Sequence, residues 1–218
     1  MNFKNKKYTI IKNVISKELA DFIYQYILLK RKVARTMFDN NYISQFTEYF
    51  GVWNDKQVPE TYSHYSDIVM ETLLIKVQPI MEKETGLNLI PNYSYTRIYK
   101  KGDVLNRHKD RFSCEISTTM HLGGGCWPIY LEPDASLGGV DEKTGNYKPS
   151  KSKGVKVLLQ PGDMLVYRGN ELEHWRNELT FNDCGQVFLH YNNADTKGAK
   201  ENTYDGRIHL GLPSWFKK

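Results

Sequence analysis

The sequence predicts a mainly β protein with helices (α+β), in which a double-stranded β-helix, or jelly roll, is supported by N-terminal helices. Three observations lead to this fold class. Apolar residues recur at helical spacing in two stretches of residues 1–91. From Asn92 onward the apolar period changes to two, and short strands follow one another with turn residues between them. The chain also contains 15 tyrosines, a residue type that favours strands.

The length of 218 residues, of which 40% are hydrophobic, suits a single domain with a sizeable core. We expect one domain over residues 1–218. Within it, residues 1–91 supply helical support and a candidate lid, residues 92–193 the jelly-roll core, and residues 194–218 a C-terminal tail.

The net charge of +5 arises from 30 basic and 25 acidic residues. This mild excess agrees with an anionic substrate or cosubstrate, but it does not indicate nucleic acid as a partner. The three cysteines, Cys114, Cys126 and Cys184, are odd in number and irregularly spaced, which argues against a disulfide framework and favours a reducing cytoplasm. No signal peptide is visible, and the most apolar helical run, residues 22–29, is too short to span a membrane.

The N-terminal third predicts a short strand, two helices and an irregular stretch. Residues 8–14 suit a strand, and Ser16 is a favourable N-cap for an amphipathic helix that runs to about Val33. The second helix begins near Pro59 or Asp67 and ends at Thr85; Pro79 should kink it, and Gly86 suits the position after its end. Between the helices, the aromatic residues of 38–53 predict either a loop packed on the core or a mobile lid.

The rest of the chain alternates between strands and turns. Tyr93, Tyr95, Arg97 and Tyr99 should share one face of a strand, because alternate side chains of a strand point to the same side. Further strands are expected at residues 115–122, 127–132, 155–159 (buried), 164–168, 174–179 and 186–191. Residues 133–153 are rich in turn residues and predict an exposed hairpin or flap, and residues 208–213 are expected to dock back onto the body.

Two segments carry the side chains that indicate a metal site. His108 and Asp110 are two apart, so on an extended strand both can reach one ion while Lys109 points away. Far downstream, His174 lies on another expected strand, and a jelly roll brings these strands together. Two histidines and one carboxylate form the set that holds non-haem Fe(II) and leaves coordination positions open for a cosubstrate and O₂.

The residues around these ligands extend the pattern. Tyr99-x-x-Gly102-x-x-Leu105-x-x-His108-x-Asp110, followed by a strand, Pro161-Gly162-Asp163, another strand and His174, resembles the 2-oxoglutarate/Fe(II)-dependent oxygenases. More narrowly, it is similar to their prolyl-4-hydroxylase-like branch, including its small bacterial and phage members. The resemblance covers residues 93–193 and implies a cupin-like jelly roll.

The resemblance implies roles for individual residues. His108, Asp110 and His174 would be the metal ligands and the catalytic centre, with Fe(II), 2-oxoglutarate and O₂ as cofactor and cosubstrates. Tyr99 matches a tyrosine that hydrogen-bonds the cosubstrate, although an ordinary core tyrosine is an equal alternative. His121 falls where relatives place a tyrosine at the cosubstrate, with a structural histidine as the alternative.

The anchor for the far carboxylate of 2-oxoglutarate departs from the usual pattern. Relatives commonly carry an arginine or lysine on the last strand, but the corresponding window, residues 183–186, holds no basic residue. Arg176 lies two residues after His174, and Arg97 lies two before Tyr99, so either can face inward and neutralise a buried carboxylate. A surface ion pair is the alternative for both.

Several neighbouring residues complete the expectations. Gln186 and His190 should face inward on the last strand and line the pocket or support the ligands. Arg107, Arg111 and Trp175 should point away from the iron, although Arg111 is a weak candidate for contact with an acidic substrate.

The pattern therefore predicts an Fe(II)- and 2-oxoglutarate-dependent dioxygenase that hydroxylates an amino acid, peptide or other small molecule and yields succinate and CO₂. Two alternatives stay open. One is a cupin-like metal-dependent oxygenase or isomerase that does not use 2-oxoglutarate, favoured by the missing basic residue after His174. The other is a non-enzymatic jelly-roll binding module.

Overall fold

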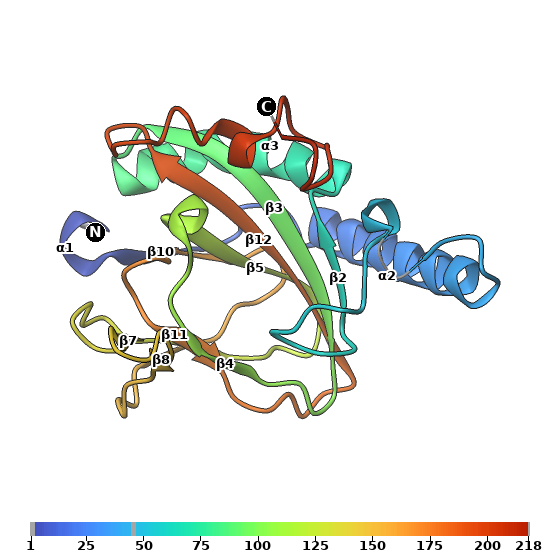
Figure 1. Cartoon of the computed structure of the whole chain (residues 1–218), viewed down its shortest axis with the longest axis horizontal. Helices are drawn as coiled ribbons and strands as arrows, with labels where there is room; N and C mark the ends of the chain where they lie inside the picture. The colour runs from blue at the N-terminus through green and yellow to red at the C-terminus, as the bar shows by residue number, and fades with distance from the viewer. Residues whose placement is uncertain (1–2, 45–46, 218) are drawn as a thin grey trace.

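The computed structural model describes residues 3–44 and 47–217, and all of its strands except those of a small hairpin form two antiparallel sheets that face one another (Figure 1). The larger sheet has the order β1-β10-β5-β12-β3-β2 and the smaller sheet β4-β11-β6-β9. The larger sheet consists of β1 (Tyr8–Ile11), β2 (Tyr62–Tyr65), β3 (Leu89–Lys100), β5 (Ile116–Gly124), β10 (Met164–Arg168) and β12 (Asp183–Asn193). The smaller consists of β4 (Leu105–His108), β6 (Ile129–Leu131), β9 (Val155–Val157) and β11 (His174–Arg176).

The expected fold class, a helix-supported jelly roll, is thus confirmed. The remaining regular elements are two long helices, a small hairpin and short helical turns. These are α1 (Phe3–Lys6), α2 (Lys17–Asp39), α3 (Ile68–Thr85), β7 (Gly139–Val140), β8 (Tyr147–Lys148), and the 3₁₀ turns η1 (Glu48–Phe50), η2 (Phe112–Cys114) and η3 (Thr203–Gly206). The β7–β8 hairpin lies inside the stretch 133–153, for which the sequence predicts an exposed flap.

The helices α2 and α3 cover the outer face of the larger sheet and form the main hydrophobic core with it. Buried apolar side chains of both helices pack against those of β5, β10 and β12. The ring of Tyr24 in α2 lies directly on Gly123 and Gly185, where a Cβ atom would come within 2.4 and 2.6 Å of that ring. Glycine at these two positions therefore allows α2 to approach the sheet closely.

Both helices begin at an N-cap. The Ser16 hydroxyl accepts a hydrogen bond from the Leu19 amide at 3.1 Å, and Asp67 accepts from the Val69 amide at 2.9 Å. The alternative start of the second helix near Pro59 is wrong, because β2 and its preceding turns occupy that stretch. The first helix extends beyond the expected end at Val33, where Ala34 is still buried against the core.

Three further expectations can be compared with the structure. The second helix continues past Pro79 to Thr85 and ends at Gly86, which has the left-handed φ of 71°. The expected buried strand at 155–159 is shorter and half exposed, because β9 lies at the edge of the smaller sheet. Residues 208–213 do dock back, as the Ser66 hydroxyl donates to the Leu212 carbonyl at 2.7 Å.

Among the helices in the described part of the chain, none combines the length and the apolar character that crossing a membrane requires.

Candidate metal centre

The smaller sheet brings together the two histidines that the sequence singles out. β4 and β11 pair antiparallel with His108 opposite His174, and the centroids of the two imidazole rings are 4.2 Å apart. Asp110 follows β4 by two residues, and its Oδ1 lies 3.6 Å from His108 Nε2 and 3.5 Å from His174 Nε2. Ligand atoms of the three side chains lie within 4.8 Å of one another, close enough to share one ion.

The second ring nitrogen of each histidine is held by a backbone carbonyl. His108 Nδ1 is 2.7 Å from the Asn106 oxygen, and His174 Nδ1 is 2.9 Å from the Leu172 oxygen. Because a carbonyl can only accept, each Nδ1 carries the proton and each Nε2 presents its lone pair. Histidine ligands of metal sites are commonly oriented in this way, so the donor set fits a bound metal ion.

Asp110 is held ionised and oriented by its surroundings. Burial alone would raise the pKa of its carboxyl group, but His174 and His108 hold that pKa well below its usual range. The Ser117 hydroxyl lies 2.7 Å from Asp110 Oδ2, and His190 Nδ1 lies 3.0 Å from the same hydroxyl oxygen. The inward face expected for His190 is therefore observed, whereas no sequence pattern signals the support by Ser117.

His108 is neutral in this environment. Burial, and after it the neighbouring His174, lowers the pKa of His108 to about 4. A neutral imidazole is the form that binds a metal, so His108 needs no deprotonation at neutral pH.

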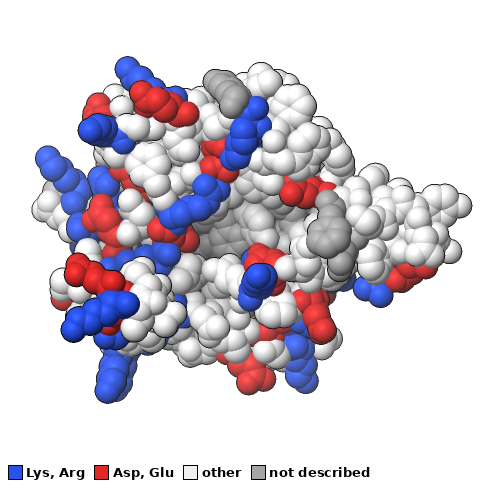
Figure 2. Space-filling model, viewed as in Figure 1, with Lys and Arg blue, Asp and Glu red and all other residues white. Residues whose placement is uncertain are grey.

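A cavity of about 340 Å³ opens beside the three side chains, between the two sheets. Figure 2 shows the hollow in the middle of the face that Figure 1 presents, with basic and acidic side chains around its rim. Tyr93, Tyr95, Arg97 and Tyr99 of β3 all line it, which confirms the alternation expected for that strand. Tyr167 of β10 also lines it, with its ring centroid 4.8 Å from that of His174; no sequence motif singles it out.

Arg176 lies deep between the sheets, with 1% of its surface exposed. Its guanidinium donates to the Trp127 carbonyl and, at 3.0 Å, to the Thr119 hydroxyl. Within residues 3–44 and 47–217, no carboxylate pairs with it, and its Nε has no hydrogen-bond partner. Burial lowers its pKa accordingly. The alternative that the sequence leaves open for Arg176, a surface ion pair, is not observed in the described part of the chain.

His121 does not line the cavity but belongs to a chain of hydrogen bonds that ends at Arg176. The Gln186 amide lies 3.0 Å from His121 Nδ1, and the Thr119 hydroxyl donates to Gln186 Oε1 at 3.0 Å. Thr119 in turn accepts from Arg176. Burial, and then the charge of Arg176, lowers the pKa of His121 to about 4, so this histidine is neutral as well.

Arg97 lines the cavity and, unlike Arg176, meets a carboxylate. Its guanidinium pairs with Asp55 and donates to Gln57 Oε1 at 3.2 Å and to the Tyr99 hydroxyl at 3.3 Å. Asp55 and Gln57 lie just beyond the candidate lid at 38–53, of which residues 45–46 lie outside the described residues. The irregular sequence around them carries no pattern that could have placed them in the cavity.

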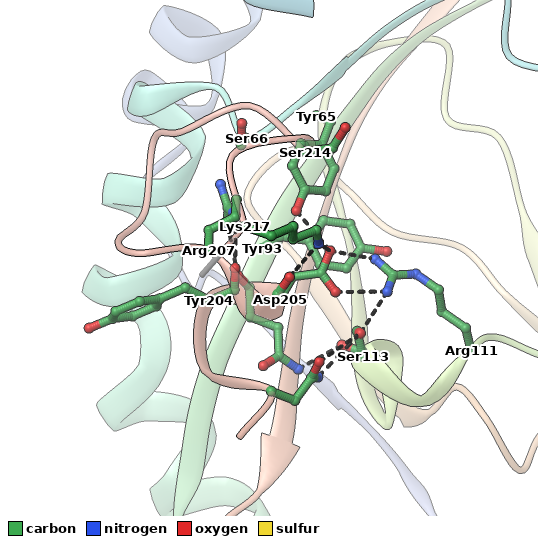
Figure 3. A network of polar contacts seen from close by, with 12 residues as sticks. Tyr65, Ser66, Tyr93, Arg111, Ser113, Tyr204, Asp205, Arg207, Ser214 and Lys217 are labelled. Atoms are coloured by element: carbon green, nitrogen blue, oxygen red, sulfur yellow. Dashed lines mark hydrogen bonds and ion pairs between the residues drawn. The ribbon is translucent and has the colours of Figure 1, made fainter. Parts of the chain in front are cut away.

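Two arginines flank the metal-ligand motif and behave differently. Arg107 points outward as expected, with its guanidinium 3.4 Å from the centre of the Trp175 ring and 2.9 Å from Glu173. The Arg111 side chain turns back and lines the cavity, so the expected outward direction is wrong, whereas its contact with an acidic substrate stays a prediction. There it pairs with Asp205 of the C-terminal tail at 2.7 Å (Figure 3), a partner that only the folded chain brings near.

Comparison with known proteins gives matches by structure only. No protein-family model and no curated protein sequence matches this chain. The epimerase SnoN of nogalamycin biosynthesis, described as non-heme and alpha-ketoglutarate dependent, superposes with a TM-score of 0.64 at 12% identity, over 97% of this chain and 92% of that one. HygX from Streptomyces hygroscopicus, with nickel and 2-oxoglutarate bound, gives 0.56 at 14% identity, over 88% and 85%.

A third match is the collagen prolyl hydroxylase vCPH of Paramecium Bursaria Chlorella virus-1, in its 2-oxoglutarate complex. Its TM-score is 0.54 at 10% identity, over 86% of this chain and 97% of that one. At such low identities the similarity establishes the fold. The resemblance seen in the sequence is confirmed at that level: this chain has the double-stranded β-helix fold of the 2-oxoglutarate- and iron-dependent oxygenases.

Proposed function

We propose that this protein is an Fe(II)- and 2-oxoglutarate-dependent dioxygenase that hydroxylates an amino acid, a peptide or another small molecule. The observation that carries the proposal is the convergence of His108, Asp110 and His174, with the unprotonated Nε2 atoms of both imidazoles close to the same carboxylate oxygen. This donor set suits non-haem iron and leaves coordination positions open. When bound, iron supplies the oxidising chemistry, which converts 2-oxoglutarate and O₂ to succinate and CO₂ while the substrate is hydroxylated.

The protein's own part is to hold the ligands in one geometry. The carbonyls of Asn106 and Leu172 orient the two imidazoles, and Ser117 orients the Asp110 carboxylate. Such supporting contacts keep the three ligand atoms in place before the metal arrives, which lowers the cost of binding it.

Arg176 is the residue that we assign to the far carboxylate of 2-oxoglutarate. A buried guanidinium without a carboxylate is costly, and a bidentate carboxylate is its best partner. Arg97 is a weaker choice for this role because Asp55 already pairs with it. Trp127 connects Arg176 to the cavity wall, because its ring lies 5.1 Å from the Arg176 guanidinium carbon and 4.8 Å from the ring of Tyr99, which lines the cavity.

His121 has an indirect role in this proposal. His121 hydrogen-bonds the side-chain amide of Gln186, and Gln186 in turn accepts a hydrogen bond from the Thr119 hydroxyl. That hydroxyl accepts a hydrogen bond from Arg176. We therefore treat His121 as a positioning residue for the anchor and not as a direct contact of the cosubstrate. Tyr99 keeps the role of a direct contact, since its hydroxyl lies at the cavity wall beside Arg97.

An anaerobic titration of Fe(II) and 2-oxoglutarate into the purified protein tests the proposal. We expect a visible metal-to-ligand charge-transfer band in the wild type, no band in His108→Ala, and an unchanged band in His209→Ala, whose histidine is exposed and outside the cavity. Arg176→Met should demand far more 2-oxoglutarate for the same band.

Other outcomes would overturn the proposal in distinguishable ways. Iron binding without a 2-oxoglutarate band would favour the cupin-like oxygenase or isomerase, and no iron binding would favour a non-enzymatic module. A shift of the 2-oxoglutarate requirement in Arg97→Met, but not in Arg176→Met, would contradict the assignment of the anchor while leaving the reaction class intact.

A further inference from the structure

The loop between η1 and β2 inserts two side chains into the mouth of the cavity. Asp55 pairs with Arg97 and accepts from the Tyr95 hydroxyl at 2.5 Å. Gln57 spans the cavity: its Oε1 accepts from Arg97 at 3.2 Å, and its amide nitrogen lies 3.2 Å from His108 Nε2. One amide group thus connects the arginine to the nitrogen that faces the metal position.

The contact of Gln57 with His108 is incompatible with a metal ligand role for that nitrogen. Because His108 Nδ1 donates to the Asn106 carbonyl, Nε2 has a single lone pair, and the Gln57 amide donates to it. A metal ion needs the same lone pair. Gln57 must therefore leave His108 when a metal binds, and Arg97 then loses one of its partners.

Arg97 has spare donor capacity even before that change. It is 2% exposed, and in the described part of the chain its Nε has no hydrogen-bond partner. Asp55 is its carboxylate partner, and that residue comes from a loop of turns closed at its base by the backbone pair Val52–Ser63. The backbone amide of Gln57 donates to Asp55 Oδ1 at 2.8 Å, so a displacement of Gln57 from the cavity also disturbs Asp55.

The second arginine–aspartate pair at the cavity mouth is built differently. Asp205 receives both guanidinium nitrogens of Arg111, the Tyr65 hydroxyl and the Lys217 ammonium (Figure 3). Its own segment is fastened to α3 by the buried pair of Arg207 with Glu71 at 2.8 Å. Asp205 is therefore a permanent partner of Arg111. The position of Asp55, in contrast, is fixed by its contacts with Arg97 and Tyr95 and by its own loop.

We infer that residues 54–58 form a latch that occupies the substrate position, and that Arg97 binds the carboxylate of the primary substrate once the latch withdraws. The inference rests on the proposed function for the position of the metal. Arginine binds carboxylates bidentately, and Asp55 fills this position in the closed state. A single amide group, that of Gln57, is long enough to contact both Arg97 and His108 Nε2. A substrate whose carboxylate binds Arg97 would therefore have its carbon atoms adjacent to that carboxylate beside the metal position. The substrate class is therefore a small organic acid or an amino acid with a free carboxylate.

The first test uses metal alone. Zn²⁺, which is redox-inert and suits imidazole and carboxylate ligands, is added to the wild-type protein, and amide hydrogen exchange is followed in residues 54–58. Exchange there should accelerate by roughly threefold or more as the latch is released, while exchange around Asp205 stays constant. Bound Zn²⁺ without any acceleration in residues 54–58 would overturn the latch.

The second test uses acetate as the carboxylate probe, with chloride at the same ionic strength as the control. The protein is labelled with ¹⁵N-arginine and saturated with Zn²⁺ and 2-oxoglutarate. In NMR spectra, the chemical shift of Arg97 Nε should then change saturably as acetate is added, whereas that of Arg111 Nε should not change. Asp55→Asn removes the competing carboxylate, so acetate should bind about tenfold more tightly to this variant. Three results would each overturn the inference. An equal response to chloride would mean that Arg97 binds an adventitious ion only. The absence of a saturable shift in Asp55→Asn, or a shift of the Arg111 signal with acetate, would mean that Arg97 is not the carboxylate site.

The two proposals fail separately. If Zn²⁺ or 2-oxoglutarate does not bind, the proposed function fails, yet acetate binding to metal-free Asp55→Asn still reports on Arg97. If both bind and Arg97 ignores acetate, the proposed function stands and the carboxylate site fails. The Arg97→Gln variant identifies the Arg97 Nε signal, because that signal is missing from its spectrum. The Arg111→Gln variant identifies the Arg111 signal in the same way and serves as the matched control from the Arg111–Asp205 pair.

Discussion

Arg176 and Arg207 are both fully buried, but among the described residues they differ in their partners: the Arg207 guanidinium lies 2.8 Å from the Glu71 carboxylate, whereas the hydrogen bonds of Arg176 go to a carbonyl and a hydroxyl. A buried charge without a countercharge weakens the fold that contains it. The contrast supports our proposal that Arg176 binds a ligand, whereas Arg207 serves the stability of the fold.

The two arginines should therefore respond oppositely to removal. Arg207→Met leaves the buried Glu71 carboxylate without its partner and should lower the free energy of unfolding by about 3–5 kcal/mol. Arg176→Met loses two hydrogen bonds but also removes an unpaired charge, so it should change that free energy by less than about 1.5 kcal/mol. Urea denaturation without ligands measures both. Equal destabilisation by the two variants would contradict a ligand-reserved Arg176.

Acid should weaken the fold through its buried histidines. Burial, and then Arg176, lowers the pKa of His121 to about 4, below the ordinary value of 6.5. Between these two pH values the unfolded chain binds more protons than the folded one, so stability is full above pH 6.5 and declines as the pH falls toward 4. His190, whose pKa burial also lowers to about 4, adds to this decline. The pKa shift of one such histidine lowers the free energy of unfolding by roughly 3 kcal/mol at most.

His121→Gln tests this decline. Glutamine can still accept from Gln186 but does not titrate, so the variant should lose less stability between pH 7 and pH 4.5 than the wild type. Urea denaturation at the two pH values gives the comparison, and His209→Gln, at an exposed position, is the control. An undiminished pH dependence in His121→Gln would show that His121 does not contribute to it.

How far the sequence predicts this molecule depends on the range of the contact. The alternation around His108 and along β3 is local, so strand periodicity alone predicts that His108 and Asp110 point to the same side and that the tyrosines of β3 share one face. The support of Asp110 by Ser117 and the pairing of Arg97 with Asp55 depend instead on which strands and loops meet. No periodicity encodes such meetings, because the partners are chosen by the packing of the whole chain.

Arg111 shows the same limit from another side. Strand alternation predicts an outward side chain, but β4 ends at His108, so the rule no longer applies three residues later. The side chain instead follows Asp205, which lies 94 residues further along the chain and is held in a left-handed conformation with a φ of 57°. The polar sequence of the C-terminal tail, residues 194–218, contains few apolar residues, so no sequence pattern predicts that the tail adopts a fixed structure beside Arg111.

Gly169 gives a way to disturb the ligand set without changing a ligand. A Cβ atom at this position would come within 2.4 Å of Asp110 Oδ2 and 2.5 Å of the Ser117 hydroxyl. Gly169→Ala should therefore push the carboxylate out of place and weaken metal binding by roughly tenfold or more. Isothermal titration with Zn²⁺ measures the change. Gly139→Ala, where nothing lies within 4 Å, is the matched control and should bind the metal as the wild type does.

Ser117→Ala removes the same support by deletion. The hydroxyl lies 2.7 Å from Asp110 Oδ2 and 3.0 Å from His190 Nδ1, and alanine leaves both without this partner. Loss of a contact that orients a ligand typically reduces metal affinity by about 10–100-fold. Ser117→Thr, which retains the hydroxyl, should recover most of the affinity. Wild-type affinity in Ser117→Ala would mean that Asp110 is oriented by its backbone alone.

The flap around β7 and β8 is tied to the strand that carries His174. Glu173 is fully buried and accepts hydrogen bonds from the Tyr147 hydroxyl at 3.1 Å, the Ser150 amide at 2.9 Å and Arg107 at 2.9 Å. Glu173→Gln keeps the shape but removes the charge, and each hydrogen bond to a charged group contributes about 1.5–3 kcal/mol. We therefore expect faster amide exchange in residues 139–152.

Tyr147→Phe, which removes one of these bonds, should give a smaller acceleration in the same residues. Lys109 also reaches this region, since its ammonium donates to the carbonyls of Ala135 and Gly138 at 2.9 and 2.7 Å. If Glu173→Gln leaves the exchange unchanged while Lys109→Met accelerates it, the flap is held from β4 and not from β11. In that case a movement of His108 on metal binding, and not of His174, would be transmitted to the flap.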